Sequence, residues 1–314
     1  MSSALEVVRT VGKEELALVH IARTRSGARI EFAESLQPPF DRDRKWVLIV
    51  STLKGCPVKC PYCDANRQPG GRLSKEEIFA QIDYMIYRRY PDGRVPASKF
   101  KVQFARMGEP MLNPAVIEVL REMRERYDAA GLIPCISTVA PKVPTSERLF
   151  DELLEIRHTV YADSDFQLQF SIHTTDRKMR RYLIPFEIWD LNEIADYGRR
   201  FYRDGYRKIT LNFALMEGVE VDAAAVRAHF DPRYFLIKLT PLNPTANARR
   251  NSLKSAVDPS LAQSNWRITR ELESVGFDVI ESVGELEENS IGSNCGQFVG
   301  EMENESSRPR TADN

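Results

Sequence analysis

The chain has 314 residues, of which 42% are hydrophobic and 28% charged, and its formal net charge is −1. This length accommodates one large α/β barrel or two average domains, and the near-neutral charge gives no whole-protein attraction to nucleic acid or anionic membranes. The charged N-terminus, the lack of any apolar run of ~20 residues and an odd count of five cysteines predict a cytoplasmic protein without signal peptide, membrane span or disulfide scaffold.

Predicted strands and helices alternate along the chain. Residues 17–36 form two strands joined by a turn at Ser26 and Gly27, a β-hairpin. Buried strands then follow at 45–51, 100–107, 133–140, 166–173, 208–216 and 234–243. Helices are predicted at 74–90, 114–130, 146–156, 186–205, 222–229 and 259–274, and a last strand at 277–283. Ser74 and Glu77 form a capping box at the first helix, and Pro114 begins the second.

Six strand-plus-helix units predict a parallel sheet covered by helices. They are too few for a closed eight-stranded barrel, so we expect an α/β fold, a partial (β/α)6 TIM-like barrel with a short N-terminal β-hairpin extension. The expected boundaries are 1–44 for the lead and hairpin, 45–285 for the barrel, 286–303 for a loop carrying Cys295, and 304–314 for a disordered tail.

Three of the five cysteines, Cys56, Cys60 and Cys63, lie within eight positions directly after the first barrel strand. Their thiolates can close a disulfide, hold a zinc ion or hold an iron–sulfur cluster. Structural zinc sites need four ligands, but no second cysteine pair follows, and no histidine lies between His20 and His158. A cubane cluster normally takes four cysteines, so three of them leave one iron open to a non-protein ligand.

This motif, in this place, resembles the radical S-adenosylmethionine (SAM) superfamily and implies a barrel of the radical SAM type. In that superfamily SAM chelates the open iron of a [4Fe-4S] cluster, and an electron from the cluster cleaves SAM to methionine and a 5′-deoxyadenosyl radical. The resemblance makes Cys56, Cys60 and Cys63 the metal ligands and Tyr62 a contact to adenine. It also implies an electron donor such as flavodoxin or ferredoxin.

Polar residues stand at the ends of the predicted strands, where a parallel barrel carries its active site. The stretch MGEP (107–110) ends the second barrel strand and resembles the superfamily's GEP-type motif, in which Gly108 allows close backbone approach. The other candidates for SAM contact are Glu109, Ser137, Ser171, Ile172, His173 and Asn243. Each alone has a structural explanation, such as a buried hydroxyl or a turn former, but together they fall at one rim.

Over about residues 45–300 the chain also resembles the RlmN/Cfr family of radical SAM methyltransferases, which methylate an adenine ring carbon in ribosomal RNA. The similar segments are GCPVKCPYC, MGEPMLN, ISTV, FSIHTTDRKMRRYLIP, LMEGV, LTPLNP and GSNCGQFVG, in this order. In that family a late cysteine accepts a methyl group from one SAM. The radical from a second SAM abstracts hydrogen from it, and the methylene radical adds to an sp² carbon. The matching catalytic residue is Cys295, whose polar, glycine-flanked surroundings disfavour a buried packing role.

One departure from this family concerns product release. The family uses a second cysteine, seven positions before the first cluster cysteine, to break the covalent adduct, and this chain has Ile49 there. Cys135 lies two residues before Ser137 on one strand, so both side chains share a face, and we expect Cys135 to be a packing cysteine one layer deeper. Glu31 or Glu34 on the hairpin is a candidate for the base that the family places there.

A second departure concerns the substrate. The family carries an RNA-binding domain before its hairpin, where this chain has about 15 residues. The segment 271–307 contains ten Asp and Glu residues and no Lys or Arg, which disfavours a phosphate chain near Cys295. The basic run at 176–182 is contrary evidence near the expected mouth, although a charge run is more often a solvated face.

We therefore predict a cytoplasmic, monomeric radical SAM enzyme with a [4Fe-4S] cluster and SAM as cofactors. Its predicted reaction is Cys-mediated methylation of an sp² carbon in a small molecule or small RNA other than large ribosomal RNA. The alternatives are a related enzyme whose hydrogen abstraction leads to rearrangement or oxidation, and a genuine RNA adenosine methyltransferase. A third is a non-catalytic or electron-transfer cluster protein.

Overall fold

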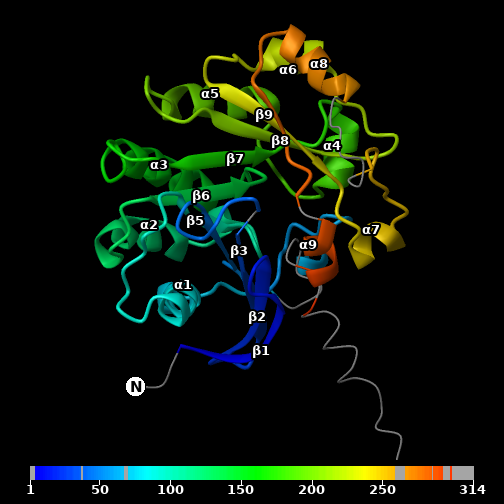
Figure 1. The fold of residues 1–314 in the computed structure, drawn as a ribbon. Helices are drawn as coiled ribbons and strands as arrows, with labels where there is room; N and C mark the ends of the chain where they lie inside the picture. Colours follow the sequence, from blue (N-terminus) through cyan, green and yellow to red (C-terminus); the bar gives the residue numbers. More distant parts are fainter. Residues whose placement is uncertain are drawn as a thin grey trace, which may run out of the picture.

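The structure is a computed structural model that describes residues 4–36, 38–66, 70–258, 266–284, 286–292 and 298. The strands of these described residues form one ten-stranded sheet, in which spatial order follows chain order (Figure 1). The strands are β1 (Leu5–Lys13), β2 (Ala17–Thr24), β3 (Arg29–Ser35), β4 (Trp46–Val50), β5 (Phe100–Phe104), β6 (Leu132–Thr138), β7 (Gln167–Ser171), β8 (Ile209–Leu215), β9 (Phe235–Pro241) and β10 (Val279–Glu281). The α-helices are α1 (Lys75–Arg89), α2 (Ala115–Arg126), α3 (Pro144–His158), α4 (Arg177–Leu183), α5 (Leu191–Phe201), α6 (Ala223–His229), α7 (Ala246–Arg250), α8 (Arg267–Ser274) and α9 (Leu286–Ile291).

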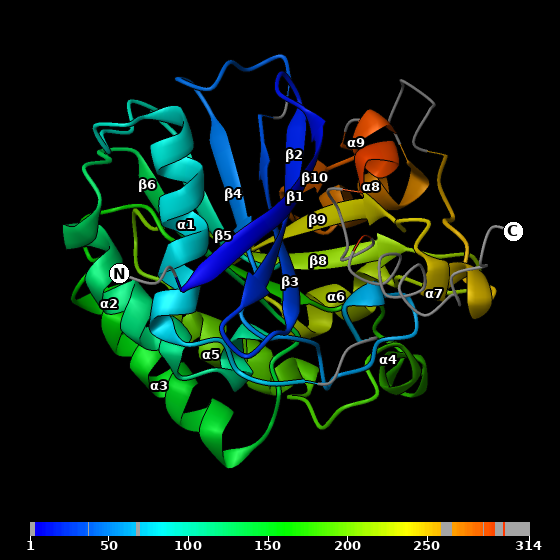
Figure 2. The ribbon, with the colours of Figure 1, turned by 90° about the horizontal axis from the view of Figure 1, so that it is seen from below.

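The sheet has an antiparallel and a parallel part. Strands β1 to β4 pair antiparallel, and β4 to β10 pair parallel, so the N-terminal meander and the barrel share one continuous sheet. Helices α1, α2, α3 and α5 lie around the outside of the curved parallel part (Figure 2). The predicted partial (β/α)6 barrel is confirmed: β4 to β9 supply six parallel strands, and the short β10 pairs with β9.

Three barrel strands, β5, β7 and β9, alternate apolar and polar side chains, which decides what they place inside the barrel. In β5, Phe100, Val102 and Phe104 are buried in the hydrophobic core, whereas Lys101 and Gln103 line cavities inside the barrel. Strands β7 and β9 repeat this pattern. Because successive side chains of a strand point to opposite faces, the apolar core lies between sheet and helices and the barrel interior is polar.

Side-chain caps fix where the helices begin. The predicted capping box of α1 is present: Ser74 Oγ accepts from the N–H of Glu77 at 3.2 Å, and the Glu77 carboxylate accepts from the N–H of Ser74 at 2.9 Å. Pro114 precedes α2, as predicted. Asp190 caps α5 at its first turn, so this helix begins later than the predicted 186–205.

The structure differs from the sequence prediction in the lead and in three short helices. The lead, where the sequence predicts no strand, forms β1, an edge strand whose mostly exposed side chains leave no strong apolar alternation to detect. Helix α4 begins inside the basic run, because the Asp176 side chain accepts from the N–H of Met179. Helices α7 and α9 have 5 and 6 residues, too few to display a helical period. Helix α9 occupies the start of the predicted loop at 286–303.

Several expectations fall on residues outside the described part of the chain. These are Cys295, the tail at 304–314 and the first part of the helix predicted at 259–274, of which α8 is described. None of the helices that the structure describes is long and apolar enough to cross a membrane.

Candidate active site

A cavity of about 400 Å³ opens at the C-terminal ends of the barrel strands. We call it the upper cavity. Its walls come from the loop after β4, the ends of β5 to β9, the end of β3 and helix α9. Of the residues singled out in the sequence, those lining it are Cys56, Cys60, Tyr62, Cys63, Gly108, Glu109, Ser137, Ser171, His173 and Asn243. Parallel barrels carry their active sites at this end.

The cysteine-bearing loop closes on itself through its backbone. The N–H of Cys56 donates to the carbonyl of Ala65 at 2.9 Å, and that of Cys63 donates to the carbonyl of Cys60 at 3.1 Å. Lys59 turns the chain with a φ of 60°. Burial raises the pKa of the Cys56 thiol to about 11 and that of Cys60 to about 12. Ionisation of these thiols is therefore favoured by a positive partner, which the iron of a cluster would supply.

The donor set fits an iron–sulfur cluster with one open iron better than a zinc ion. Three thiols line one cavity, and the described residues contain no group of three or more His, Cys, Asp or Glu side chains that would hold a single metal ion. The loop does not offer the tight tetrahedral shell of a zinc site. A cubane distributes its thiolates over separate irons, which suits a wider arrangement.

Helix α7 holds the cysteine loop from the far end of the barrel sheet. Thr245 Oγ1 donates to the carbonyl of Tyr62 at 2.6 Å, and Asn247 Nδ2 donates to that of Cys63 at 2.7 Å. The Asp64 carboxylate accepts from two backbone N–H groups in the first turn of α7, at 3.0 and 2.9 Å. These groups would otherwise lack partners at the helix start, so loop and helix satisfy one another.

His173 fixes the ring of Tyr62. The N–H of Ala214 donates to His173 Nδ1 at 3.1 Å, so the proton sits on Nε2, which donates to Tyr62 Oη at 2.9 Å. The two rings meet edge to face with centroids 5.2 Å apart. Burial, and then the charge of Arg180, lower the pKa of His173 to about 3, so the imidazole is neutral. Two residues that the family resemblance assigns to SAM are thus in contact with each other.

Glu109 connects the segment that follows β5 to the end of β6. Its carboxylate accepts from Thr138 Oγ1 at 2.5 Å and from the N–H groups of Val139 at 2.9 Å and Met111 at 3.0 Å. Burial raises the pKa of Glu109 to about 7, although these three hydrogen bonds favour the charged form. The side chain therefore shapes the turn that carries the GEP-type motif.

Close packing explains the neighbouring Gly108. Its φ is 99°, and a Cβ at this position would lie 2.5 Å from the side chain of Leu53. Only glycine lets the end of β5 pass this close to the segment that leads into the cysteine loop.

The remaining strand-end candidates do not all face the upper cavity. Ser137 and Ser171 line it, and Gln169 Nε2 donates to Ser137 Oγ at 3.4 Å. The side chain of Ile172 does not line it but is fully buried in the hydrophobic core. A contact between Ile172 and SAM would have to use the backbone.

Ile49 lines the upper cavity at the position where the family has its second cysteine. Glu31 and Glu34 do not line it. Glu31 forms a buried ion pair with Arg106 at 2.6 Å, and Glu34 pairs with Arg89 at 2.9 Å. Both hairpin carboxylates form ion pairs with arginines and do not line the cavity, so neither is placed to act as a base there.

Cys135 lies on the same strand as Ser137 and is buried, as predicted. Its Sγ donates to the carbonyl of Ile133 at 3.4 Å. Burial raises its pKa to about 11, against the opposing effect of Lys101. These contacts are those of a packing cysteine.

Sequence reasoning missed a hydrogen-bonded pair in the same wall as Ile49. Ser35 Oγ donates to the Glu288 carboxylate at 2.5 Å, and both residues are buried and line the upper cavity. Ser35 ends β3 and Glu288 belongs to α9, so no motif joins them in the sequence. The pair thus places a hydroxyl and a carboxylate in the cavity that Ile49 also lines.

Comparison with known families decides what kind of enzyme this is. Residues 50–221 match the radical SAM superfamily. The chain belongs to the radical SAM superfamily. It is a radical SAM enzyme, and the cofactors of the superfamily are a [4Fe-4S] cluster and SAM.

The curated relatives are RlmN-like. The chain is 27% identical over 278 residues to a probable dual-specificity RNA methyltransferase RlmN from Acidothermus cellulolyticus, covering 83% of this chain and 60% of that protein. It is 28% identical over 295 residues to one from Frankia casuarinae, covering 89% and 63%. A relative of the same name from Desulfitobacterium hafniense is 30% identical over 276 residues, covering 84% and 70%. The chain thus spans less than two thirds of the length of the first two relatives.

A solved structure shows the same fold. A radical SAM methyltransferase from Sphaerobacter thermophilus superposes with a TM-score of 0.67 at 21% sequence identity, covering 94% of this chain and 81% of that one.

Proposed function

We propose that the protein is a radical SAM methyltransferase that transfers a methyl group to an sp² carbon, with Cys295 as the methyl carrier. The observation that carries this proposal is the upper cavity, where three cysteines of one loop face polar residues from the ends of successive barrel strands. The printed names of its relatives, RNA methyltransferases, support the reaction class.

In this proposal the cavity residues divide into cluster ligands and SAM contacts. Cys56, Cys60 and Cys63 hold the cluster, which when bound supplies the electron for reductive cleavage of SAM. Tyr62, oriented by neutral His173, packs against the adenine. The SAM contacts are completed by the backbone around Gly108 and Glu109, by Ser137, Ser171 and Asn243, and by the backbone of Ile172.

Cys295 lies outside the described residues, and its role rests on the family resemblance. It follows four residues after Ile291, the last residue of α9, and α9 contributes Glu288 to the upper cavity. A thiol that carries a methyl group between SAM and substrate needs to work at this cavity.

For release of the product from Cys295 we propose the pair of Ser35 and Glu288. Isoleucine at position 49 has no acid–base or redox chemistry, so a disulfide-forming release cannot occur there. A carboxylate held by a hydroxyl in the same wall can instead remove the proton from the substrate carbon, so that the C–S bond breaks and Cys295 leaves as a thiolate. One electron from the reduced electron donor and one proton would then complete the methyl group of the product.

The proposed substrate is a molecule other than large ribosomal RNA, because ten Asp and Glu residues and no Lys or Arg occupy 271–307 around Cys295. The structure weakens this argument in part, since Asp278 pairs with Lys208, and Glu287 with Lys13.

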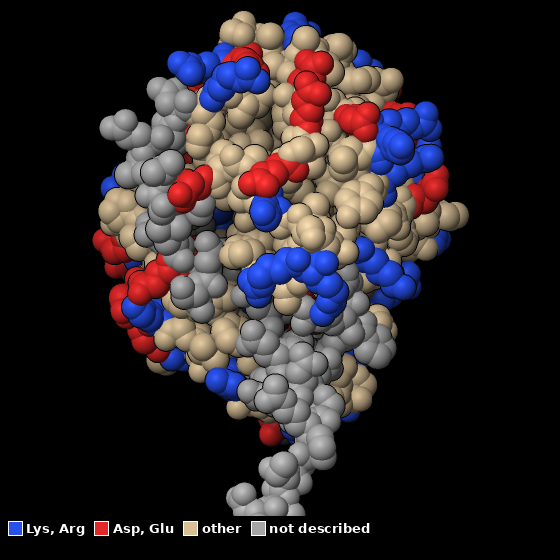
Figure 3. Space-filling model, turned by 90° about the vertical axis from the view of Figure 1, so that its right-hand side faces the viewer, with Lys and Arg blue, Asp and Glu red and all other residues tan. Residues whose placement is uncertain are grey.

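An RNA substrate is the second candidate. Figure 3 shows the face that carries α4, α7 and α9, where Lys and Arg gather near the middle and Asp and Glu lie above them. Helix α4 exposes Arg177, Lys178 and Arg181, and α7 exposes Arg249 and Arg250.

Anaerobic incubation with SAM and dithionite tests the enzyme class, because 5′-deoxyadenosine must form. Intact-mass analysis of anaerobically purified protein tests the methyl carrier: a mass increase of one methyl group should map to the peptide containing Cys295. Formation of 5′-deoxyadenosine by a protein whose Cys295 is never methylated would replace this proposal with non-methylating hydrogen abstraction.

A further inference from the structure

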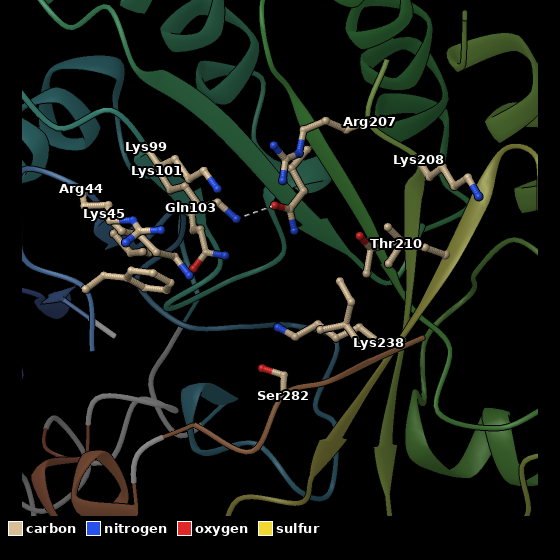
Figure 4. A pocket seen from close by; sticks show the side chains of 15 residues that line it. Arg44, Lys45, Lys99, Lys101, Gln103, Arg207, Lys208, Thr210, Lys238 and Ser282 are labelled. Atoms are coloured by element: carbon tan, nitrogen blue, oxygen red, sulfur yellow. Dashed lines mark hydrogen bonds between the residues drawn. The ribbon is translucent and has the colours of Figure 1, made fainter. Parts of the chain in front are cut away.

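A second cavity, of about 330 Å³, opens at the opposite end of the barrel, at the N-terminal ends of its strands. We call it the basic cavity (Figure 4). Seven of its 15 lining residues are Lys or Arg, and none of the described residues that line it is Asp or Glu. The seven are Arg44, Lys45, Lys99, Lys101, Arg207, Lys208 and Lys238.

The inner lysines come from separate strands and converge. Lys45 directly precedes β4, Lys101 belongs to β5 and Lys238 to β9, and Figure 4 shows their amino groups pointing into the same space. All three are half-buried. The alternation of the barrel strands turns these side chains inward, where an ordinary barrel would have aliphatic residues.

Of the cations that line the basic cavity, those paired with carboxylates lie at its rim. Arg207 pairs with Asp165 at 3.0 Å, and Lys208 pairs with Asp278 at 2.5 Å. Lys45, Lys101 and Lys238 have no ion-pair partner among the described residues. Lys101 Nζ donates only to the amide oxygen of Gln167, at 2.9 Å.

Burial, together with the neighbouring cations, disfavours the charged form of the inner lysines. Burial, and then neighbouring cations, lower the pKa of Lys45 and, to about 8, that of Lys238; burial also lowers the pKa of Lys101. Lysines that repel one another in a recess are stabilised by an anion placed between them. A concave surface lined by one sign of charge also focuses its field and concentrates counter-ions.

We propose that the basic cavity binds a compact oligophosphate, a chain of two or three linked phosphates, separately from the SAM site. Lysine binds phosphate through a point charge on a flexible side chain. Three inner lysines therefore suit a ligand with several phosphate groups better than a ligand with a single carboxylate. The volume of about 330 Å³ lies in the range of small-ligand sites. A nucleic acid backbone does not fit this proposal, because the inner lysines lie within a recess at the end of the barrel rather than along a surface groove.

The basic cavity borders the upper cavity. Gln103, Lys238 and Ser282 line both of them. An oligophosphate in the basic cavity therefore lies directly beneath the SAM site, and Lys238 is the residue that both ligands would sense.

The experiment measures binding of sodium tripolyphosphate to the full-length, cluster-loaded protein by calorimetry and by the thermal unfolding midpoint, in buffer free of phosphate and sulfate. We expect tripolyphosphate to raise the midpoint of the wild type. Adenosine triphosphate and adenosine test whether a nucleoside contributes to binding. If tripolyphosphate and adenosine triphosphate bind equally well and adenosine does not bind, the cavity recognises the phosphates alone.

The variant Lys45→Gln/Lys101→Gln should bind tripolyphosphate at least tenfold more weakly, yet unfold at a higher temperature than wild type when no anion is present. A purely structural role would lower the midpoint instead. Lys99→Gln, at the exposed mouth, provides a variant whose fold is not at risk and should weaken binding less. Lys254→Gln removes an exposed lysine that lines neither cavity and should leave binding unchanged.

Three results would overturn the proposal. The first is that the wild type does not bind tripolyphosphate. The second is that Lys254→Gln loses as much affinity for tripolyphosphate as Lys45→Gln/Lys101→Gln does. The third is that Lys45→Gln/Lys101→Gln binds tripolyphosphate as tightly as the wild type. Tight binding of a long RNA with none of tripolyphosphate would likewise replace it with a nucleic acid site. None of these outcomes depends on methyltransferase activity.

Discussion

Asn247 donates its side-chain amide to the backbone carbonyl of Cys63 at 2.7 Å, and so ties the cysteine loop to a helix 184 positions further along the chain. Asn247 is buried, and its loss leaves this carbonyl without its donor, a cost of about 1–3 kcal/mol. Asn247→Ala should therefore fold but retain less iron and sulfide after reconstitution, and lose SAM cleavage in proportion.

Arg249→Ala is the matched control on the same helix, because the Arg249 guanidinium donates to Pro244 rather than to the cysteine loop. Iron analysis and the cluster absorbance compare the two variants. Equal cluster content in Asn247→Ala and wild type would show that α7 does not hold the loop in place.

The cluster should depend on Cys56, Cys60 and Cys63, since these thiols line the upper cavity together. Replacing any one of them by Ala should abolish the iron–sulfur absorbance and 5′-deoxyadenosine formation. Cys135→Ala should keep both, because Cys135 is buried and hydrogen-bonded to Ile133. Cys295→Ala should also keep the cluster; its loss there would identify Cys295 as a fourth ligand.

The sequence predicted the barrel and the position of its active end because both depend on local signals. Strand alternation, the capping box of α1 and the cysteine spacing are visible within a few residues. The Ser35–Glu288 pair, the clamp of α7 on the cysteine loop and the convergence of Lys45, Lys101 and Lys238 join segments far apart in the chain. Their geometry depends on sheet register, which a single sequence does not encode as a motif.

Lys238 should make stability rise with pH. Its pKa in the folded protein is about 8, below the ordinary lysine value of 10.5, because of burial and then the charges of Lys101 and Lys45. Between these two values the unfolded chain binds more protons than the folded one, so the unfolding free energy increases as pH rises from about 8 to 10.5. Below pH 8, Lys238 is protonated in both the folded and the unfolded protein, so the burial of its charge lowers the unfolding free energy by its full amount.

Lys238→Gln removes this cost and should be more stable than wild type at pH 7, by an amount on the order of 1–3 kcal/mol. The difference between the two proteins should shrink as the pH approaches 10. Denaturant unfolding across this pH range measures it. The charged or titratable groups around Lys238 are Lys101, Lys45 and Cys135, which both proteins share. A variant that is less stable at every pH would contradict the assignment.

Glu288→Gln should trap the reaction before release. If the Ser35–Glu288 pair removes the proton that frees the product, the variant purified from cells should carry substrate covalently bound to Cys295. Intact-mass and peptide analysis would find this adduct and identify the substrate at the same time. Glu287→Gln changes the neighbouring carboxylate, which pairs with Lys13, and should carry no adduct.

The absence of an adduct in Glu288→Gln, together with normal methylation of Cys295, would assign release to another group. Ser35→Ala offers an independent check, because it removes the hydroxyl that holds the carboxylate but leaves the acid–base group in place. A smaller amount of the same adduct is expected from it.

Binding of ribosomal RNA fragments should be weak. A protein that neutralises about six to ten phosphates loses roughly 10³–10⁵ in affinity between 50 and 200 mM salt. The exposed cations of α4 and α7 are Arg177, Lys178, Arg181, Arg249 and Arg250, and these five are fewer than such a contact surface needs. Arg180 is not available for it, since this residue is buried and its guanidinium donates to the carbonyl of Trp189 at 2.7 Å.

Filter binding of ribosomal RNA fragments across salt concentrations decides between the two substrate candidates. The test variant is Arg177→Gln/Lys178→Gln/Arg181→Gln on α4. The control is a triple variant of cations elsewhere on the outer surface, Arg148→Gln/Arg203→Gln/Arg227→Gln. Arg180 is left intact so that the fold of α4 is preserved. Weak binding with a shallow salt dependence in all three proteins supports a substrate other than large ribosomal RNA. Tight, steeply salt-dependent binding that disappears in the α4 variant and persists in the outer-surface variant would establish α4 as part of an RNA-binding surface and would favour the RNA substrate.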